Sequence, residues 1–315
     1  MPTGRKLKDT VPVSPRRAYG WIFALVAATW PLPAAAQATF HAGTTLVPVF
    51  TTVTDEKDRL VPDLSSGDFE IFDNGKRQRV AMFANDVVPL TIVVMLDTSA
   101  SMTAVLDDVK AAAEQFVIRL FPADQARLCV FNDRVRFMSA FTHDRDALAA
   151  SAREVDFGLQ TRLYDATAAS LDALRTAADR KVIVILSDGE DTASSTHWRT
   201  IVQRARAEDV MVYGIGFESQ FRDGDEVVHT TPDPSLRKLA EETGGGYVTV
   251  TRAGALAGTF TDILKELHSQ YLLAFAPAAN DGRVHRLVVQ TRNGEHVRAR
   301  RSYVAASGTP HTHGR

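Results

Sequence analysis

The sequence predicts an α/β fold, in which a doubly wound, mostly parallel sheet is joined by a small β-unit built from the flanking strands. Three observations lead to this prediction. Over residues 89–268, short strands alternate with helix-length amphipathic segments. The runs T-I-V-V-M-L and V-I-V-I-L are apolar on both faces, which is typical of parallel strands covered by helices on each side. Residues 39–88 and 269–305 instead carry strand patterns punctuated by turn signals.

The composition is that of an ordinary globular protein. The chain has 315 residues, of which 45% are hydrophobic and 23% are charged. Its formal net charge of -2 gives no general attraction to nucleic acid or to an anionic membrane. Cys129 is the single cysteine, so no intrachain disulfide can form, and its apolar surroundings predict a small buried side chain.

Residues 1–36 have the order of a secretory signal peptide. A basic stretch precedes an apolar run at 21–30, and small residues follow, with A-x-A sites that end at Ala36 and Ala38. The apolar run is shorter than the roughly 20 residues of a spanning helix, so no stable membrane span is expected after cleavage. Arg16 and Arg17 leave both Sec and twin-arginine export open. The mature protein is therefore predicted to be secreted or periplasmic.

Cleavage after Ala36 also changes the charge of the chain. It removes five basic residues and one acidic residue, so the net charge moves from -2 to -6. A mildly acidic exported protein is better suited to binding divalent cations than polyanions.

The flanking segments are predicted to pair with each other. In 39–88, the run V-P-V-F-T-T-V-T alternates, and Asn74-Gly75 between two strand-like runs predicts a hairpin. In 269–305, three more strand-like runs are separated by Asp281-Gly282 and Asn293-Gly294. The strands of 269–305 are too short to fold alone, so we expect them to pair with those of 39–88 in one small β-unit. Residues 306–315 are predicted to be a disordered tail.

The central segment, 89–268, alternates between predicted strands and predicted helices. Apolar runs predict strands at 90–96, 127–131, 181–186, 210–216 and 246–250. Amphipathic periodicity predicts helices at 102–120, 145–155, 163–178, 196–208, 234–243 and 256–268.

Hard-cation ligands follow the predicted strands. Asp97, Ser99 and Ser101 end the first strand, Asp188 ends another, and Thr161 lies in a loop before a helix. In an open α/β sheet, ligands bind outside the carboxyl ends of the strands. Hydroxyl and carboxylate oxygens suit Mg²⁺, with Mn²⁺ or Ca²⁺ as alternatives, whereas zinc favours His and Cys. Neutral hydroxyls leave the cation electron-poor, so an Asp or Glu of a protein partner could complete its coordination.

This constellation resembles the von Willebrand factor type A domain with its metal-ion-dependent adhesion site. The family pattern is Asp-x-Ser-x-Ser after the first strand, a loop Thr, and an Asp in an S-D-G-like turn. The resemblance implies a Rossmann-like fold, with Ser99, Ser101 and Thr161 as direct ligands and Asp97 and Asp188 often acting through water. Phrases such as F-E-I-F-D-N-G-K and E-L-H-S-Q-Y-L-L-A-F also look like a bacterial secreted subfamily often labelled "VWFA-related".

A polar loop at 217–234 follows a strand, so it should lie on the same face as the cation. We expect contacts with the partner from this loop and from the turn after Asp188, through Glu190, Asp191, Gln220, Arg222 and Asp223.

Three functions fit this sequence. The first is an exported, divalent-metal-dependent module, adhesive or scaffolding, that captures an acidic side chain of another protein. The second is a structural subunit of an envelope complex with a stabilising metal. The third is a metal-assisted hydrolase, which the sequence disfavours because it contains no G-x-S-x-G, H-E-x-x-H, P-loop or G-x-G-x-x-G motif. We therefore predict that the protein is not an enzyme.

Overall fold

A computed structural model describes residues 46–218, 220–223 and 226–307, and the side chains of 220–223 are outside the description. The described residues all fall in one compact unit, Gly43–Arg315. The predicted signal peptide at 1–36, the start of the 39–88 segment and residues 308–315 of the predicted tail lie outside the described residues.

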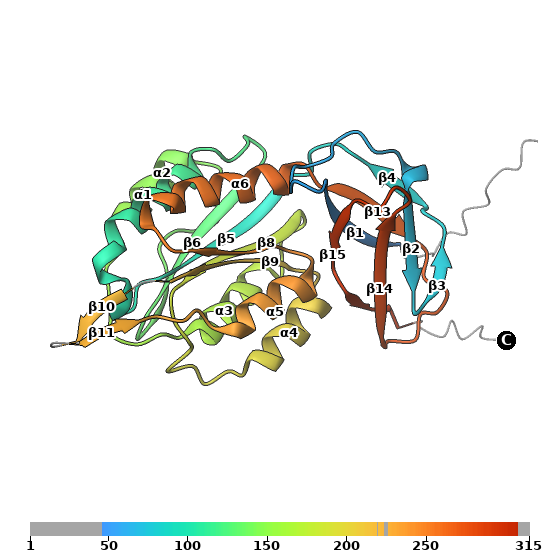
Figure 1. Cartoon of the computed structure of the whole chain (residues 1–315). Coiled ribbons are helices and arrows are strands. Elements are labelled where there is room, and N and C mark those ends of the chain that lie inside the picture. The colour runs from blue at the N-terminus through green and yellow to red at the C-terminus, as the bar shows by residue number, and fades with distance from the viewer. Residues whose placement is uncertain (1–45, 219, 224–225, 308–315) are drawn as a thin grey trace, which may run out of the picture. The chain divides into compact units, whose positions relative to one another are not determined.

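The central sheet has six strands in the order β12-β9-β8-β5-β6-β7 (Figure 1). Neighbouring strands are parallel, except that the edge strand β7 runs antiparallel to β6. The strands are β5 (Leu90–Asp97), β6 (Gln125–Phe131), β7 (Val135–Phe137), β8 (Arg180–Ser187), β9 (Met211–Phe217) and β12 (Tyr247–Val250). The predicted doubly wound, mostly parallel sheet is thus confirmed, and the sequence missed only its short edge strand β7.

Helices cover both faces of this sheet (Figure 1). One face is covered by α1 (Leu106–Val117), α2 (Arg145–Arg153) and α6 (Leu256–His268), and the other by α3 (Leu163–Leu174), α4 (Trp198–Ala207) and α5 (Pro234–Thr243). All eight residues of β5 are buried because both of its faces meet helices. Ile92 and Val94 pack into one core and Val93 and Met95 into the other, as the alternation of side chains along a strand requires.

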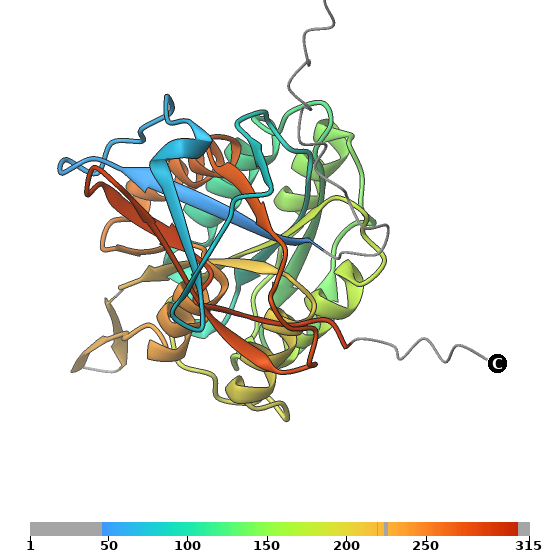
Figure 2. The same cartoon turned by 90° about the vertical axis from the view of Figure 1, so that its right-hand side faces the viewer.

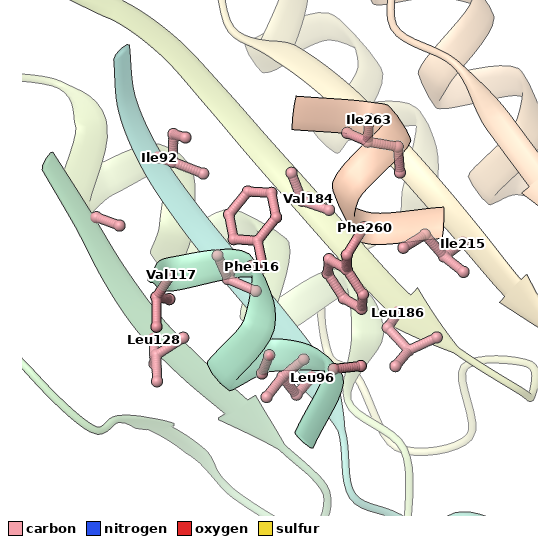
Figure 3. Close-up of a cluster of buried hydrophobic side chains, with 14 of the residues drawn as sticks. Ile92, Leu96, Phe116, Val117, Leu128, Val184, Leu186, Ile215, Phe260 and Ile263 are labelled. Atoms are coloured by element: carbon pink, nitrogen blue, oxygen red, sulfur yellow. The ribbon is translucent and has the colours of Figure 1, made fainter. Parts of the chain in front are cut away.

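Aromatic side chains fill the first of these cores. Figure 3 shows Phe116 of α1 and Phe260 of α6 close together over the sheet. Their ring centroids are 5.5 Å apart in an edge-to-face arrangement. Each ring is fully buried and stabilises the fold by about 1.5–3 kcal/mol relative to an exposed ring.

The helix predicted at 102–120 is divided in the structure. A 3-10 helix, η2 (Ala100–Val105), comes first, and α1 begins at Leu106. The amide of Met102 donates to the carbonyl of Ser99 at 3.0 Å, which is the short-range bond of a 3-10 turn.

The flanking strands form a β-unit of two four-stranded sheets, which confirms that part of the fold prediction. Figure 2 shows strands from the two ends of the described chain, in blue and red, lying side by side. β1 pairs with β13 and β15, and β2 pairs with β14, all antiparallel. Asn74 and Gly75 connect β2 to β3 with φ of 48° and 78°, the left-handed conformation of a tight hairpin.

The strands of the β-unit and the short remaining elements complete the fold. One sheet has the order β15-β1-β13-β4 and the other β16-β14-β2-β3. Their bounds are β1 (Val47–Thr54), β2 (Phe69–Asp73), β3 (Lys76–Gln78), β4 (Met82–Ala84), β13 (Tyr271–Phe275), β14 (Val284–Thr291), β15 (His296–Ala299) and β16 (Ser302–Val304). Two further 3-10 helices are η1 (Ser66–Asp68) and η3 (Ala253–Ala255).

The segment predicted as a polar loop contains a hairpin. β10 (Gln220–Asp223) and β11 (Glu226–His229) pair antiparallel, with Asp223 opposite Glu226. The two strands are short and rich in polar residues, so no alternation of apolar and polar residues indicates them in the sequence. The hairpin emerges after the carboxyl end of β9, and β10 lies beside η2 (Figure 1).

Candidate metal centre

The candidate site lies where the order of the strands reverses direction. After β5 the chain first adds β6 on one side of it, and later adds β8 on its other side. Such a switch point leaves a crevice at the carboxyl ends of the two adjacent strands. β5 ends at Asp97 and β8 ends at Ser187, so Asp97 and Asp188 come from neighbouring strand ends.

Four of the five predicted ligands are joined by polar contacts. The amide of Ser99 donates to Oδ1 of Asp97 at 2.9 Å. The hydroxyls of Ser99 and Ser101 are 3.2 Å apart, and Ser101 donates to Oδ1 of Asp188 at 2.9 Å. A continuous row of oxygen atoms therefore runs from the loop after β5 to the turn after β8.

Burial makes it energetically unfavourable for the two carboxylates of this row to be ionised. Asp97 and Asp188 are fully buried, and Ser99 is 2% exposed. Burial raises the pKa of Asp97 to about 7, and the neighbouring Asp188 carboxylate raises it too, while hydrogen bonds from Ser187 and Ser99 oppose the shift. A bound cation would stabilise the ionised carboxylates and remove this penalty.

Thr161 is held against the turn that contains Asp188. Its carbonyl accepts from the amides of Thr192 at 2.9 Å and Ala193 at 3.1 Å. Its own amide donates to Oγ1 of Thr192 at 3.0 Å. The side chain is 5% exposed at the start of the α3 region. The structure thus fixes the loop before α3 and the loop after β8 to each other.

Of the residues expected to contact a partner, one is exposed and another is hydrogen-bonded within its own loop. Glu190 is exposed beside the buried Asp188. The carboxylate of Asp191 accepts from the amide of Tyr164, near the start of α3, and from the amide and hydroxyl of Ser194. Asp191 therefore stabilises the loop itself. The side chains of the remaining three residues lie outside the described part of the chain: Gln220, Arg222 and Asp223.

Two contributors were not identified from the sequence. Ser187 donates to Oδ2 of Asp97 at 2.6 Å and so links the ends of β5 and β8. From its position in the sequence, Asp165 is expected to be a helix-capping or surface acid. In the structure, its carboxylate accepts hydrogen bonds from the amides of Ser195 and Thr196. The S-D-G turn could have pointed to Ser187, but nothing near Asp165 in the sequence indicates a loop thirty residues away.

Thr98 faces away from the row. Its hydroxyl accepts from Nδ2 of Asn132 at 3.0 Å, and its amide donates to the carbonyl of Phe131. This follows from the alternation in D-T-S-A-S, which places Thr98 on the side opposite Asp97 and Ser99.

The donor set fits a small hard cation. Oxygen ligands of octahedral Mg²⁺ lie at about 2.1 Å from the metal, which places adjacent ligands about 3 Å from one another. The spacings of 2.9 Å and 3.2 Å in the row match this requirement. Within the described residues, no three side chains of His, Cys, Asp or Glu cluster as a metal site.

Comparison with known proteins identifies the central part of the chain. Residues 92–190 match the family model of the von Willebrand factor type A domain. No curated protein matches the sequence.

Several solved structures are similar to this chain. A von Willebrand factor type A protein from Catenulispora acidiphila is 13% identical, with a TM-score of 0.49, over 86% of this chain and 76% of that one. An aerotolerance-related membrane protein from Bacteroides fragilis is 15% identical, with a TM-score of 0.47, over 56% of this chain and 99% of that one.

A third similar structure is proximal thread matrix protein 1 from the mussel byssus, described with a zinc-occupied MIDAS motif. It is 18% identical, with a TM-score of 0.49, over 61% of this chain and 48% of that one. Identities and scores this low transfer no site residue to this chain. The match at 92–190 spans the loop after β5, Thr161 and the turn after β8. The central part of the chain, residues 92–190, therefore matches a von Willebrand factor type A domain.

Proposed function

We propose that this protein is an exported, divalent-cation-dependent protein-binding module, acting in adhesion or as a scaffold. The observation that carries this proposal is the set of polar contacts, between buried or partly buried groups, that joins Asp97, Ser99, Ser101 and Asp188 at the ends of β5 and β8. Asp97, Ser99, Ser101, Thr161 and Asp188 would hold the cation, and a partner would complete its coordination with an Asp or Glu carboxylate.

Each residue has a separate role in this proposal. When bound, the cation supplies a Lewis-acidic centre that attracts a carboxylate. The buried carboxylates of Asp97 and Asp188 balance its charge, either directly or through water. The hydroxyls of Ser99, Ser101 and Thr161 add oxygen donors without further negative charge, so the site keeps its attraction for an outside acid. Ser187 orients Asp97 through its 2.6 Å hydrogen bond.

Mg²⁺ is the proposed cation, with Mn²⁺ and Ca²⁺ as alternatives for the same oxygen set. The proposed location is the periplasm or the exterior of the cell, because residues 1–36 have the order of a signal peptide. In the described part of the chain, no helix has the length and apolar character needed to cross a bilayer.

A structural role for the metal is the second candidate, favoured by the burial of both carboxylates. A module of an envelope complex would use the cation to hold β5 and β8 together. Thermal unfolding without added metal separates the two functions. A protein that stays folded when stripped of metal but no longer binds acidic ligands supports the binding module, whereas one that melts without metal supports the structural role.

The first experiment is calorimetric titration of the mature protein with Mg²⁺. We expect saturable binding to the wild type and loss of at least about tenfold in affinity for Asp97→Ala and for Thr161→Ala, because each removes an oxygen donor. Asp107→Ala, which removes an exposed acid on α1, is the matched control and should bind normally. Absence of Mg²⁺, Mn²⁺ and Ca²⁺ binding to a folded wild type would contradict the proposal.

A further inference from the structure

Two large apolar side chains are exposed close to the candidate metal centre. Phe157 is 57% exposed and Leu159 is 74% exposed, the highest value for any large apolar residue in the described part of the chain. They belong to the loop that leads into Thr161, and Leu159 is two residues from that predicted ligand. Their Cα atoms can therefore be at most about 7 Å apart.

The same loop is bonded to the D-T-S-A-S segment. The amide of Gly158, between the two apolar residues, donates to the carbonyl of Thr98 at 2.8 Å. Thr98 lies between Asp97 and Ser99 in the chain. One backbone hydrogen bond thus places Phe157 and Leu159 beside the segment that supplies three of the five proposed ligands.

Several contacts fix this loop in position. The amide of Leu159 donates to Oδ2 of Asp133 at 2.7 Å, and Nε of Arg162 donates to the carbonyl of Asp133 at 2.9 Å. A Cβ at Gly158 would lie 2.6 Å from Cγ of Asn132 and from Oδ2 of Asp133, so any larger residue would have to displace these side chains. Phe157 and Leu159 are therefore held outward by an ordered backbone.

We propose that Phe157 and Leu159 form an apolar contact surface beside the cation, and that the partner's acidic residue is flanked by large apolar side chains. This inference rests on the proposed function, which supplies the carboxylate. Exposed apolar residues next to a charged centre fit a protein segment that offers an acid and apolar neighbours together.

Apolar contacts would also strengthen the metal–carboxylate interaction. Side chains that exclude water around a central polar contact are typical of binding hot spots. The Coulomb attraction between a carboxylate and a cation increases when water is removed from around them. Phe157 and Leu159 would therefore contribute their own buried area and shield the ionic contact from solvent.

The test uses four pools of short cyclic peptides. The central residue is Glu or Gln, and the neighbouring positions are either Leu and Phe or Ser and Asn. Binding to the mature protein is measured by fluorescence anisotropy with Mg²⁺ and with a chelator. The variants are Phe157→Ser, Leu159→Ser and the double variant, and Val284→Ser is the control because Val284 is a 55% exposed residue in the β-unit.

We expect the Glu pool with apolar neighbours to bind at least about tenfold more tightly than the Glu pool with polar neighbours. The double variant should remove this preference and leave the Mg²⁺ affinity unchanged, whereas Val284→Ser should retain both. Equal binding of the two Glu pools, or a preference that survives in the double variant, would overturn this inference and leave the proposed function standing.

The remaining outcomes concern the proposed function. Equal binding of the Glu and Gln pools, or binding that persists with chelator, would contradict a cation-dependent capture of an acid, and this inference would fall with it. If no pool binds to Mg²⁺-loaded protein, the inference is overturned as well.

Discussion

At the scale of single residues, Asp165 shows how a side chain outside the proposed ligand set supports the site. It lies in the first turn of α3, and its carboxylate accepts from the amides of Ser195 and Thr196 at 2.9–3.2 Å. Partial burial would raise its pKa, but these hydrogen bonds outweigh that effect and lower the pKa from 3.8 to about 2. The ionised carboxylate therefore holds the loop after β8 against α3.

We predict that Asp165→Ala lowers the free energy of unfolding by about 1–2 kcal/mol at neutral pH. Because the folded-state pKa is depressed, this stabilisation is complete above the unfolded value near 4 and is lost as the pH falls towards 2. Urea unfolding from pH 7 to pH 3 measures the difference between wild type and variant, which should shrink below pH 4.

Asp146→Ala is the control for this measurement. Asp146 is likewise an acid in the first helical turn, here of α2, and it is exposed. It should show a smaller difference from the wild type, because the favourable interaction of a first-turn acid with the helix dipole is modest. A constant difference between wild type and Asp165→Ala down to pH 3 would argue against a role for the ionised carboxylate.

At the scale of elements, the β10–β11 hairpin is placed to influence partner choice. It follows the carboxyl end of β9, and β10 lies beside η2, which contains Ser101. Glu226 and Val227 of β11 are exposed. The hairpin contributes no proposed metal ligand, so its effect on binding can be separated from its effect on the cation.

Replacement of residues 219–230 by a short Gly-Ser connection should weaken the binding of apolar-flanked acidic peptides. The Mg²⁺ affinity should not change, because all five proposed ligands remain. Anisotropy and calorimetry on the same preparation measure the two quantities. Peptide binding equal to that of the wild type would show that the hairpin is only a solvated connection.

At the scale of the whole described chain, a polar network joins the α/β sheet and the β-unit. Glu266, near the end of α6, accepts from Thr52 of β1 at 2.9 Å and also from Tyr213 of β9 and Arg298 of β15. Gln270 donates to Thr52 at 2.6 Å and to Tyr213 at 3.0 Å. Burial and the Glu266 carboxylate raise the pKa of Tyr213, so its hydroxyl remains a donor.

We predict that Glu266→Ala lowers the free energy of unfolding by about 3 kcal/mol, because three donors from separate strands lose their acceptor and Arg298 loses its counter-charge. Asp262→Ala is the matched control, since Asp262 is an exposed acid on the same helix, paired only with Lys265 among the contacts described. Chemical denaturation of both variants tests this. Similar effects from the two substitutions would show that the network adds no stability.

The sequence by itself determined the fold class, because the fold class follows from hydrophobic patterns and turn residues within short segments of the chain. Runs that are apolar on both faces specify buried parallel strands, and Asn74-Gly75 specifies a hairpin through the backbone conformations that these residues allow. It also placed Asp97, Ser99 and Ser101 at the end of β5 and Asp188 directly after β8. The carboxyl ends of parallel strands meet at one edge of a sheet, so these positions could be combined before any contact was known.

Only the tertiary structure decided how these segments support one another. The hydrogen bond from Ser187 to Asp97, the capture of residues 195–196 by Asp165, and the bond from Gly158 to Thr98 join residues between about thirty and ninety positions apart. No periodicity records such contacts, because they depend on the paths of loops between elements. For the same reason, the outward placement of Phe157 and Leu159 and the network around Glu266 became visible only in the folded chain.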